Sequence, residues 1–561
     1  MVAVRRSFSS VVFFCIVFCM ASAMAFGSAS NIYITQNGSP SGNCTANVLT
    51  PAFFNNAANW GSGSGQIGPG TTVLLCGTIT FPANSSGLTV QGSGASGNPV
   101  TIKFDTNAIL QSPAFAGTWN TSGGGIDIER VSYVTVDGNN LTGIVQNTQN
   151  GSPSVTCSNG SACAYQNSSY GIKIRAANNI TVQNLTITSI YNNCGAQGSS
   201  CNDSAGADTA DIGIDGAGIS TPSSNIVISG NYLGKSRTGV GATFAATNIS
   251  GLEIANNTFN DHGWHMTIQG ANANVATNVL IHGNDISNFA DWAYPPATYH
   301  LDGIITFTGS ASGTPAYTPY IYNNYFHGGF DGGPEATAYV YCSGPDDGSS
   351  NTVNESCNIF NNVFDIPSDN TSIWIGANTS ILSGTHRIYN NTFVGPCGAM
   401  SGFGIVLDPN PGKLDWENNI AYNFGVQMTS YATTQSGFFS QITASNHNVW
   451  NSTCTLGFNY DFGGSGVIQG YSTWQSAGGF DANSSSANPN LSGTYTLGSG
   501  SSAIGMGTNM TSSCSGNFAP LCTDRAGTPR PSSGAWDAGA YQFSSAAGAP
   551  TPPTGLAAVI Q

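Results

Sequence analysis

Short apolar runs alternate with neutral polar turns through the middle of the chain. One phrase recurs, in which a short β-branched run is followed by an asparagine turn and then by an aromatic or aliphatic residue. The turn asparagines are Asn184, Asn231, Asn257, Asn284, Asn324, Asn362, Asn391 and Asn419. From Asn231 to Asn419 the steps are 26, 27, 40, 38, 29 and 28 residues. Such a period with occasional insertions is typical of stacked coils, because insertions go into loops while each coil keeps its strands.

A second phrase of the form Gly-Ile-x-Ile comes before these turns, as in residues 125–128 and 171–174. Its period of two predicts a strand whose isoleucines face inward and whose intervening residue faces outward. A pair of such short strands cannot bury its apolar side alone, but stacked coils bury a continuous column. One short repeat per coil is too small for a four-stranded propeller blade. We therefore predict an all-β fold, a right-handed parallel β-helix built as a single-stranded solenoid.

The turn asparagines have a predicted role of their own. Asparagine tolerates left-handed backbone geometry, and at the same corner of successive coils its amide can form a hydrogen-bonded ladder. At the start of the chain, Thr50 followed by Pro51 is good helix-start chemistry, which predicts a short helix over 50–60. A helix there would cap the open end of the column and protect its edge strands.

Composition removes several classes of protein. Charged residues make up only 7% of the 561 residues, and 72 residues are glycine. A mainly helical protein needs charged helix formers on its surface, so that class is excluded. The net charge of −15 argues against a nucleic-acid partner, because such proteins carry a basic face.

The N-terminus reads as an export signal. Arg5 and Arg6 precede an unbroken apolar run over 11–20, and residues 23–25 offer a small-x-small cleavage site. That run is too short to span a bilayer and no longer one follows, so we expect a secreted or cell-surface protein that does not span the membrane.

The cysteines point the same way. Of the 14 cysteines, two lie in the signal, and the even number left in an exported chain suggests disulfides. The pairs that we consider are Cys44–Cys76, Cys157–Cys163, Cys194–Cys201, Cys342–Cys357, Cys514–Cys522 and, by elimination, Cys397–Cys454.

From about Asn31 to Phe543 the chain resembles the right-handed parallel β-helix proteins of the pectate-lyase-like superfamily. The opening over 32–37, the helix-like segment and the strand after Pro69 look like the usual start of such proteins. The stretch from Asp524 to Tyr541 is similar to the choice-of-anchor tail of bacterial surface β-helix proteins. In similar lyases Arg or Lys commonly neutralises the uronate carboxylate and removes the neighbouring proton, often with Ca²⁺.

These features predict the organisation of the chain. Its parts are a signal peptide over 1–25, an N-terminal cap and first coils over 26–124, central coils over 125–430, C-terminal coils with the anchor-like segment over 431–545, and a Pro-rich tail over 546–561. We expect a monomer that binds a polysaccharide.

The outward positions of the Gly-Ile-x-Ile strands should stack into one exposed row, which suits an extended sugar polymer. That row contains Asp127, Glu129, Lys173, Arg175, His265, Thr267, Gln269, Ile305, Phe307 and Trp374, with Tyr339 or Tyr341 joining it. Phe307 and Trp374 are its candidate sugar-stacking residues. The alternative is an ordinary solvated sheet face.

Residues that carry protons in a reaction are expected between positions 262 and 302, where several histidine and aspartate residues occur. If the strands align at Gly263 and Gly303, His262 and Asp302 occupy equivalent positions on coils about 4.8 Å apart and could share a proton. We name His262, His265, His300 and Asp302 as candidate catalytic residues. Polar capping at strand starts is the alternative reading, and His282 is expected on another face.

Charged residues supply the remaining candidates. Lys173, Arg175, Lys235 and Arg237 form a basic strip that could bind the carboxylates of an acidic glycan, although a solvated pair is the plainer reading. Asp203, Asp208, Asp211 and Asp215 form an acidic set. The last three could hold Ca²⁺ through hard oxygen ligands, or serve as a hydrolase acid and base.

Three functions remain open. The leading hypothesis is a lyase- or epimerase-type enzyme acting on acidic glycans. A non-catalytic glycan-binding or surface protein is the alternative, and a glycoside hydrolase that uses paired Asp residues is the third.

Overall fold

A computed structural model describes residues 31–118, 120–149, 168–190, 209–216, 219–244, 250–270, 277–290, 301–307, 318–330, 336–344, 352–367, 370–376, 381–397, 403–454, 457–461 and 466–544. Several expectations fall outside these residues: the signal peptide, the pairs Cys157–Cys163 and Cys194–Cys201, His300, Asp203, Asp208 and the Pro-rich tail. Among the helices of the described part, none is long and apolar enough to cross a membrane.

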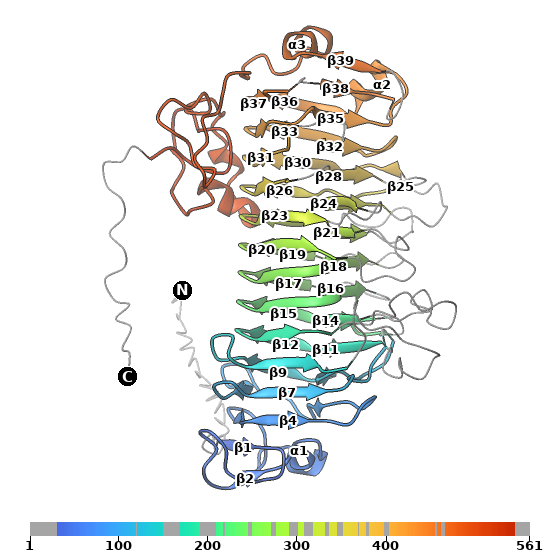
Figure 1. The fold of residues 1–561 in the computed structure, drawn as a ribbon, viewed down its shortest axis with the longest axis vertical. Coiled ribbons are helices and arrows are strands. Elements are labelled where there is room, and N and C mark those ends of the chain that lie inside the picture. Colours follow the sequence, from blue (N-terminus) through green and yellow to red (C-terminus); the bar gives the residue numbers. More distant parts are fainter. Residues whose placement is uncertain are drawn as a thin grey trace, which may run out of the picture.

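The chain winds into stacked coils, each of which has strands on three sides, and the predicted right-handed parallel β-helix is confirmed (Figure 1). We name the sides faces A, B and C in chain order. A 14-stranded sheet forms face A, and a 23-stranded sheet forms faces B and C, because β16 and β18 run around the corner between them. Neighbouring strands are parallel except for the last pair, β38 and β39.

Face A comprises β1 (Ile32–Ile34), β2 (Val48–Leu49), β3 (Thr72–Leu75), β6 (Val100–Phe104), β9 (Ser132–Asp137), β12 (Asn178–Gln183), β15 (Ser224–Ser229), β17 (Ser250–Ala255), β19 (Thr277–His282), β22 (Pro319–Tyr322), β26 (Asn358–Phe360), β30 (Thr385–Tyr389), β33 (Lys413–Glu417) and β36 (Ile442–Asn446). Face B comprises β4 (Thr78–Thr80), β7 (Ile109–Ser112), β10 (Ile144–Asn147), β13 (Thr186–Thr188), the first parts of β16 (Tyr232–Phe244) and β18 (Thr258–Gly270), β20 (Asp285–Phe289), β23 (Tyr325–Phe330), β27 (Val363–Asp365), β31 (Thr392–Val394), β34 (Ile420–Tyr422) and β37 (Val449–Asn451).

Face C comprises β5 (Leu88–Thr89), β8 (Ile126–Glu129), β11 (Ser169–Arg175), β14 (Thr209–Asp215), the second parts of β16 and β18, β21 (Leu301–Phe307), β24 (Ala336–Ser343), β28 (Thr371–Gly376), β32 (Phe403–Leu407), β35 (Val426–Ser430) and β38 (Gly457–Asn459), followed by β39 (Val467–Gln469). A separate short pair is formed by β25 (Thr352–Val353) and β29 (Ile381–Leu382).

The turn from face A to face B contains the predicted asparagine ladder. Asn324 Oδ1 accepts hydrogen bonds from the backbone N–H of Asn284 at 3.0 Å and from its Nδ2 at 2.9 Å. Asn324 Nδ2 in turn donates to Ile281 O at 2.9 Å and to Asn362 Oδ1 at 3.0 Å. The same bonds join successive coils from Asn231 to Asn419, and the last rung meets Asn448. The ladder thus satisfies polar groups that the coil stack buries.

One expectation about this turn is corrected. We expected a single asparagine to adopt left-handed geometry and to form the ladder, but two adjacent residues divide these roles. Asn323, immediately before ladder residue Asn324, has a φ of 57°. Asn184, with a φ of 54°, is likewise the left-handed residue of its turn and not a ladder residue. The ladder position of that coil is occupied by Leu185, whose backbone N–H donates to Asn231 Oδ1.

Both ends of the column are capped. At the N-terminal end the helical segment is shorter than the predicted one, with α1 over Pro51–Phe54 and the 3-10 helix η1 over Ala57–Asn59. Thr50 is the N-cap residue, although its side chain makes no capping hydrogen bond. At the other end lie α2 (Gln435–Ser440) and α3 (Tyr471–Gly478), and Trp474 of α3 stacks on Phe458 with ring centroids 4.1 Å apart.

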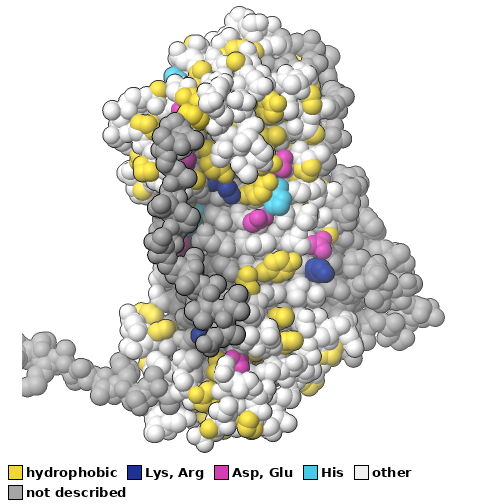
Figure 2. Space-filling view, turned by 60° about the vertical axis from the view of Figure 1, so that its left-hand side comes forward, with side chains coloured by type: hydrophobic (Ala, Val, Ile, Leu, Met, Phe, Trp, Pro, Cys, Tyr) yellow, Lys and Arg dark blue, Asp and Glu magenta, His cyan; other side chains and the backbone are white. Residues whose placement is uncertain are grey.

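Residues 480–543, which include η3 (Thr511–Ser513) and η4 (Gly516–Cys522), form a C-terminal segment that packs on the outside of the column (Figure 1). Figure 2 shows this segment standing out from the surface. It is held by the left-handed asparagines of the turns, since Asn361 Nδ2 donates to Thr523 O at 2.8 Å and Asn418 Nδ2 donates to Thr508 O at 2.9 Å. The anchor-like stretch predicted from the sequence therefore folds back on the β-helix.

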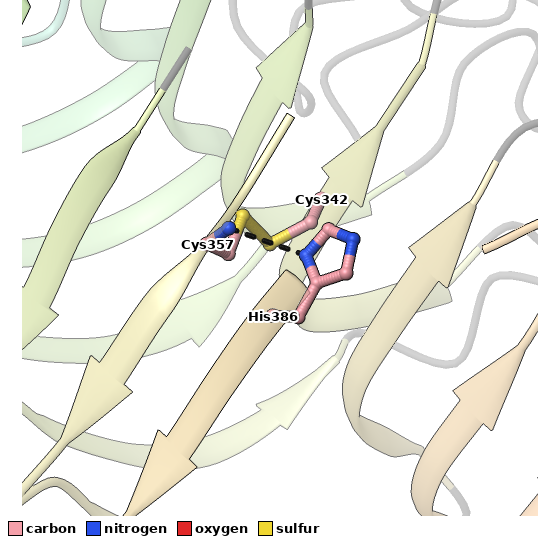
Figure 3. Close-up of side chains that lie close together, drawn as sticks. All are labelled: Cys342, Cys357 and His386. Atoms are coloured by element: carbon pink, nitrogen blue, oxygen red, sulfur yellow. Dashed lines mark hydrogen bonds between the residues drawn. A yellow bond between two sulfur atoms is a disulfide. The ribbon is translucent and has the colours of Figure 1, made fainter. Parts of the chain in front are cut away.

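Four expected disulfides are present among the described residues: Cys44–Cys76, Cys342–Cys357, Cys397–Cys454 and Cys514–Cys522. The fully buried His386 lies beside Cys342–Cys357, and its Nδ1 accepts a hydrogen bond from the Cys357 backbone N–H at 3.2 Å (Figure 3). Burial lowers the pKa of His386 to about 4, opposed by a hydrogen bond with the Pro411 backbone. The imidazole is therefore neutral at pH 7, with its proton on Nε2.

We predict that Asn324→Ala lowers the free energy of unfolding by about 3 kcal/mol or more, because it leaves several buried donors and acceptors without partners. Denaturant unfolding at neutral pH measures this. The exposed Asn483 supplies the control Asn483→Ala, for which we expect less than about 0.5 kcal/mol. Equal losses in the two variants would show that the ladder contributes no special stability.

The second prediction concerns acid stability. His386 stays neutral in the folded protein down to about pH 4, whereas its ordinary pKa is 6.5. The unfolded chain therefore gains a proton first, and stability is lost as the pH falls through this window. His386→Asn, whose amide oxygen can still accept from Cys357, should lose about 2 kcal/mol less than the parent between pH 7.5 and pH 5. Parallel stability curves from denaturant unfolding would contradict the assignment.

Candidate functional site

The row predicted for the Gly-Ile-x-Ile strands exists on face C, but it is not exposed throughout, because Asp127, Lys173, Ile305, Val406 and Thr429 are buried. In register on successive coils, its residues are Asp127, Lys173, Gly213, Gly241, Thr267, Ile305, Tyr341, Trp374, Val406 and Thr429. Tyr341 rather than Tyr339 joins the row. Phe307 is paired with Ser343, two residues farther along β21. The row therefore passes from charged residues through two glycines to aromatic residues.

A charged cluster forms the N-terminal end of this row. Lys173 and Arg175 on β11 are in register with Asp127 and Glu129 on β8. Arg175 Nη1 lies 3.4 Å from Glu129 Oε2, and its Nη2 donates to Asn120 O at 2.9 Å. The buried Lys173 Nζ lies 4.3 Å from the centroid of the Tyr170 ring. Both predicted cations are thus held in place by neighbouring groups.

Asp127 is the group in this cluster that titrates near neutral pH. Burial and the neighbouring Glu129 charge raise the pKa of Asp127 to about 7, against the opposing effects of the Gly123 N–H, Arg175 and Lys173. The residue is 4% exposed, and its Oδ1 accepts no hydrogen bond from the described part of the chain. A carboxyl group with these properties can both accept and donate a proton near pH 7.

The other half of the expected basic strip lies elsewhere. Lys173 is in register with Gly213 and thereby with Gly241 of β16, not with Lys235 or Arg237. Lys235 is exposed at the corner between faces B and C, where its φ is 60°. Arg237 packs over Trp264, with Cζ 4.9 Å from the ring centroid. The four cations therefore do not form one row, because the corner separates them.

Steric crowding explains why the first residue of the Gly-Ile-x-Ile phrase is glycine in several coils. At Gly171 a Cβ would lie 2.6 Å from the Asp211 carbonyl oxygen of the next coil, and at Gly239 it would lie 2.6 Å from that of His265. The position points into the corner between faces B and C. Five described coils have a larger buried residue in place of this glycine: Asp211, His265, Tyr339, Ser372 and Gln427.

His265 therefore faces inward, and its predicted place on the outer row is wrong. It is fully buried, its ring stacks on Phe289 with centroids 4.4 Å apart, and its Nε2 lies 2.9 Å from Ser287 O. Burial lowers the pKa of His265 to about 3. In β18 the inward pair is Met266 and Ile268, so His265 rather than Gly263 occupies the glycine position.

The pairing of His262 with Asp302 is corrected for the same reason. Asp302 is in register with Trp264, while His262 is in register with Phe289 of face B. Asp302 is fully buried, and its Oδ1 accepts from the Ala338 N–H at 3.2 Å. Burial raises the pKa of Asp302 well above its usual range. The two candidate proton carriers thus belong to different faces.

The carboxylate partner of His262 is Asp211. His262 Nε2 lies 2.9 Å from Asp211 Oδ2, and both side chains are completely buried. Burial raises the pKa of Asp211 and lowers that of His262, so burial favours the uncharged form of each partner. Sequence reasoning missed this pair, although Asp211 standing at a glycine position before Ile212 was a readable signal.

Asp211 and Asp215, two of the expected Ca²⁺ ligands, serve different partners. Asp215 accepts hydrogen bonds from the Ser223 N–H at 2.8 Å, the Ser223 hydroxyl at 2.7 Å and the Ala176 N–H at 2.9 Å. The third expected ligand, Asp208, lies outside the described residues, so calcium binding stays a prediction. Possible metal-ligand atoms also lie close together in Cys342, Cys357 and His386. Both sulfur atoms, however, are joined in the Cys342–Cys357 disulfide (Figure 3).

An aromatic strip forms the other end of face C. Trp374 has its ring centroid 6.0 Å from that of Tyr341 and 6.0 Å from that of Tyr431, which follows β35. All three side chains are half-buried, and Trp374 Nε1 donates to Asp408 Oδ1 at 2.9 Å. Face C therefore offers partly exposed ring surfaces in line with the helix axis. His282, by contrast, stacks on Tyr322 of face A, as expected for another face.

No protein-family model and no curated protein matches the chain. Among solved structures, it is similar to the pectate lyase Pel9A at 14% identity and a TM-score of 0.41, over 92% of this chain and 97% of that chain. It is similar to an exopolygalacturonase from Thermotoga maritima at 9% identity and a TM-score of 0.35, over 70% of this chain and 84% of that chain.

A third similar structure is PfbA, a surface protein and adhesin of Streptococcus pneumoniae, at 14% identity and a TM-score of 0.37, over 65% of this chain and 90% of that chain. At such identities the likeness concerns the fold alone, and none of these activities passes to this chain. On its own sheet topology, the chain is a right-handed parallel β-helix.

Proposed function

We propose that this secreted protein binds an extended polysaccharide along face C and acts on acidic glycans as a lyase- or epimerase-type enzyme. The observation that carries the proposal is the register of the outward row, from Asp127 and Lys173 at one end to Tyr341 and Trp374 at the other. These ends are separated by several coil steps of about 4.8 Å each. A linear polymer parallel to the axis could span this distance.

The aromatic strip supports sugar binding. Aromatic faces stack on the apolar faces of sugar rings, while polar neighbours bond the hydroxyls. Tyr341, Trp374 and Tyr431 are half-buried, so their rings are held in position while part of each surface remains open. The bond from Trp374 to Asp408 further fixes the indole.

The charged cluster supports the proposed chemistry. A lyase or epimerase must neutralise the uronate carboxylate, remove the proton on the adjacent carbon, and supply a proton to the leaving oxygen or to the same carbon. Lys173 and Arg175 provide positive charge beside Asp127. Asp127, with a pKa of about 7, is suited to accept the proton.

A non-catalytic glycan-binding protein is the second candidate. It is favoured by the burial of His262, His265 and Asp302, which removes three of the four expected proton carriers from the outer surface. A hydrolase that uses Asp211 and Asp215 is less well supported, because those carboxyl groups serve separate partners. The two leading candidates differ in whether a bound acidic glycan is turned over.

The test of turnover is a panel of acidic polysaccharides, assayed with and without a chelator for unsaturated uronyl products and for new reducing ends. For a substrate found in this way, we predict that Asp127→Asn lowers kcat by 100-fold or more while glycan binding is retained. In the parent, kcat should rise as the pH increases through about 7, because the deprotonated carboxylate is the active form. An unchanged rate in the variant would remove Asp127 from the mechanism.

The test of binding is independent of turnover. We predict that Trp374→Ala weakens binding of the polymer by about tenfold, or about 1.4 kcal/mol, through the loss of ring stacking. Isothermal calorimetry with an oligosaccharide measures the affinity. Tyr33→Ala is the matched control, since Tyr33 is a half-buried aromatic residue on face A. Equal affinities of Trp374→Ala and the parent would contradict binding on face C.

A further inference from the structure

The edge where the C-terminal segment meets face B gathers polar and aromatic side chains that the proposed face C site does not use. Figure 2 shows histidine, acidic and basic side chains close together beneath this segment. We call this group the Arg525 cluster. Its members are Asp285, His327 and Tyr325 of face B with Tyr495, Arg525 and Tyr541 of the C-terminal segment.

Arg525 is the cation of the cluster, and no carboxylate of the described residues forms a salt bridge with it. Its Nη1 donates to the Tyr541 hydroxyl at 2.7 Å, whereas its Nε makes no hydrogen bond within the described part. The guanidinium carbon lies 5.6 Å from the centroid of the Tyr325 ring. Arg530, by contrast, donates hydrogen bonds to Gly539 O and the Gln542 side chain of the segment and to the Asn361 side chain of a β-helix turn.

The nearby carboxylates are already engaged. Asp285 Oδ1 lies 2.7 Å from His327 Nε2, and the His327 ring stacks on Tyr325 with centroids 4.2 Å apart. Burial and hydrogen bonding with Asp365 and Tyr325 raise the pKa of Tyr495, so its hydroxyl remains protonated near pH 7. Among the described residues Arg525 therefore makes no direct salt bridge, although the charges of Asp285 and Asp365 act on the same Tyr325 side chain as the Arg525 charge does.

The backbone around Arg525 is fixed before any ligand binds. The buried Asp524 accepts hydrogen bonds from the N–H groups of Ala526 at 2.9 Å, Thr528 at 2.7 Å and Gln542 at 2.9 Å. The Arg525 N–H donates to Ala540 O at 2.9 Å. A preorganised guanidinium loses less entropy on binding an anion than a flexible one.

We propose that the Arg525 cluster is a binding site for a carboxylated sugar, separate from face C. Arg525 pairs with the carboxylate, a group that its planar fork of donors matches. Tyr325 and Tyr495, whose ring centroids are 6.0 Å apart, are half-buried, and we assign contact with the sugar ring to the parts of these rings that remain exposed. The inference rests on the proposed function for the class of ligand, but its site shares no residue with face C.

Calorimetry on the full chain tests this site with three probes: methyl glucuronoside, methyl glucoside and acetate. We expect the glucuronoside to bind best, and Arg525→Gln to weaken it by tenfold or more. Arg525→Lys should keep part of the affinity by retaining the charge. Arg387→Gln on face A is the control that should bind it as the parent does.

Each other result overturns a part or the whole of the inference. Unchanged affinity in Arg525→Gln, or no binding of the glucuronoside by the parent, would remove the site. Equally strong binding of methyl glucoside would contradict carboxylate recognition, and equally strong binding of acetate would contradict a role for the aromatic rings. Loss in Trp374→Ala alone would place the sugar on face C. Failure of polymer binding on face C would leave the Arg525 result standing, so the two proposals can fail separately.

Discussion

Backbone hydrogen bonding between successive coils is the constraint on which the rest of this molecule depends. Each coil must meet the next at the strand spacing of about 4.8 Å on all three faces. The ladder from Asn231 to Asn448 satisfies the buried turn groups at one corner of this stack. At another corner the same spacing leaves no room for a Cβ in several coils, and glycine is the result. Side chains at equivalent positions then line up in rows, which is how distant residues come to share a face.

The repeat made the architecture readable from the sequence. Its period, the strand phrase and the ladder were predicted, and so was the order of Asp127, Lys173 and Trp374 along face C. Disulfides between nearby cysteines were also predictable, since Cys342–Cys357 and Cys514–Cys522 needed only short loops. These predictions share one physical cause. In a periodic structure, equivalent positions of successive coils have the same surroundings, so a pattern found in one coil applies to the next.

The candidate site was less predictable, because it departs from the repeat. Gly263 looked like the repeat glycine, but the chain turns the corner within β18 and His265 takes that position. This alignment differs from the predicted one by two residues. The alternation of inward and outward positions therefore looked unchanged in the sequence, but His262 and His265 lie in the interior of the β-helix. The pairing of His262 with Asp211 joins residues 51 positions apart, and the Arg525 cluster joins face B to a segment that follows all the coils. Contacts of these kinds carry no local pattern in the sequence.

Polar chemistry is divided between the inside and the outside of the column. Asp211, His262 and His265 lie at the inner corner, where burial favours their uncharged forms, whereas Asp127, Lys173 and the aromatic strip lie on the outer side of face C. We propose that a glycan lies along that face. A crystal structure of the protein with an acidic oligosaccharide tests this placement most directly. We predict a sugar chain parallel to the helix axis that contacts Trp374 and extends toward Asp127. An oligosaccharide bound only on face A, or only at another surface, would contradict it.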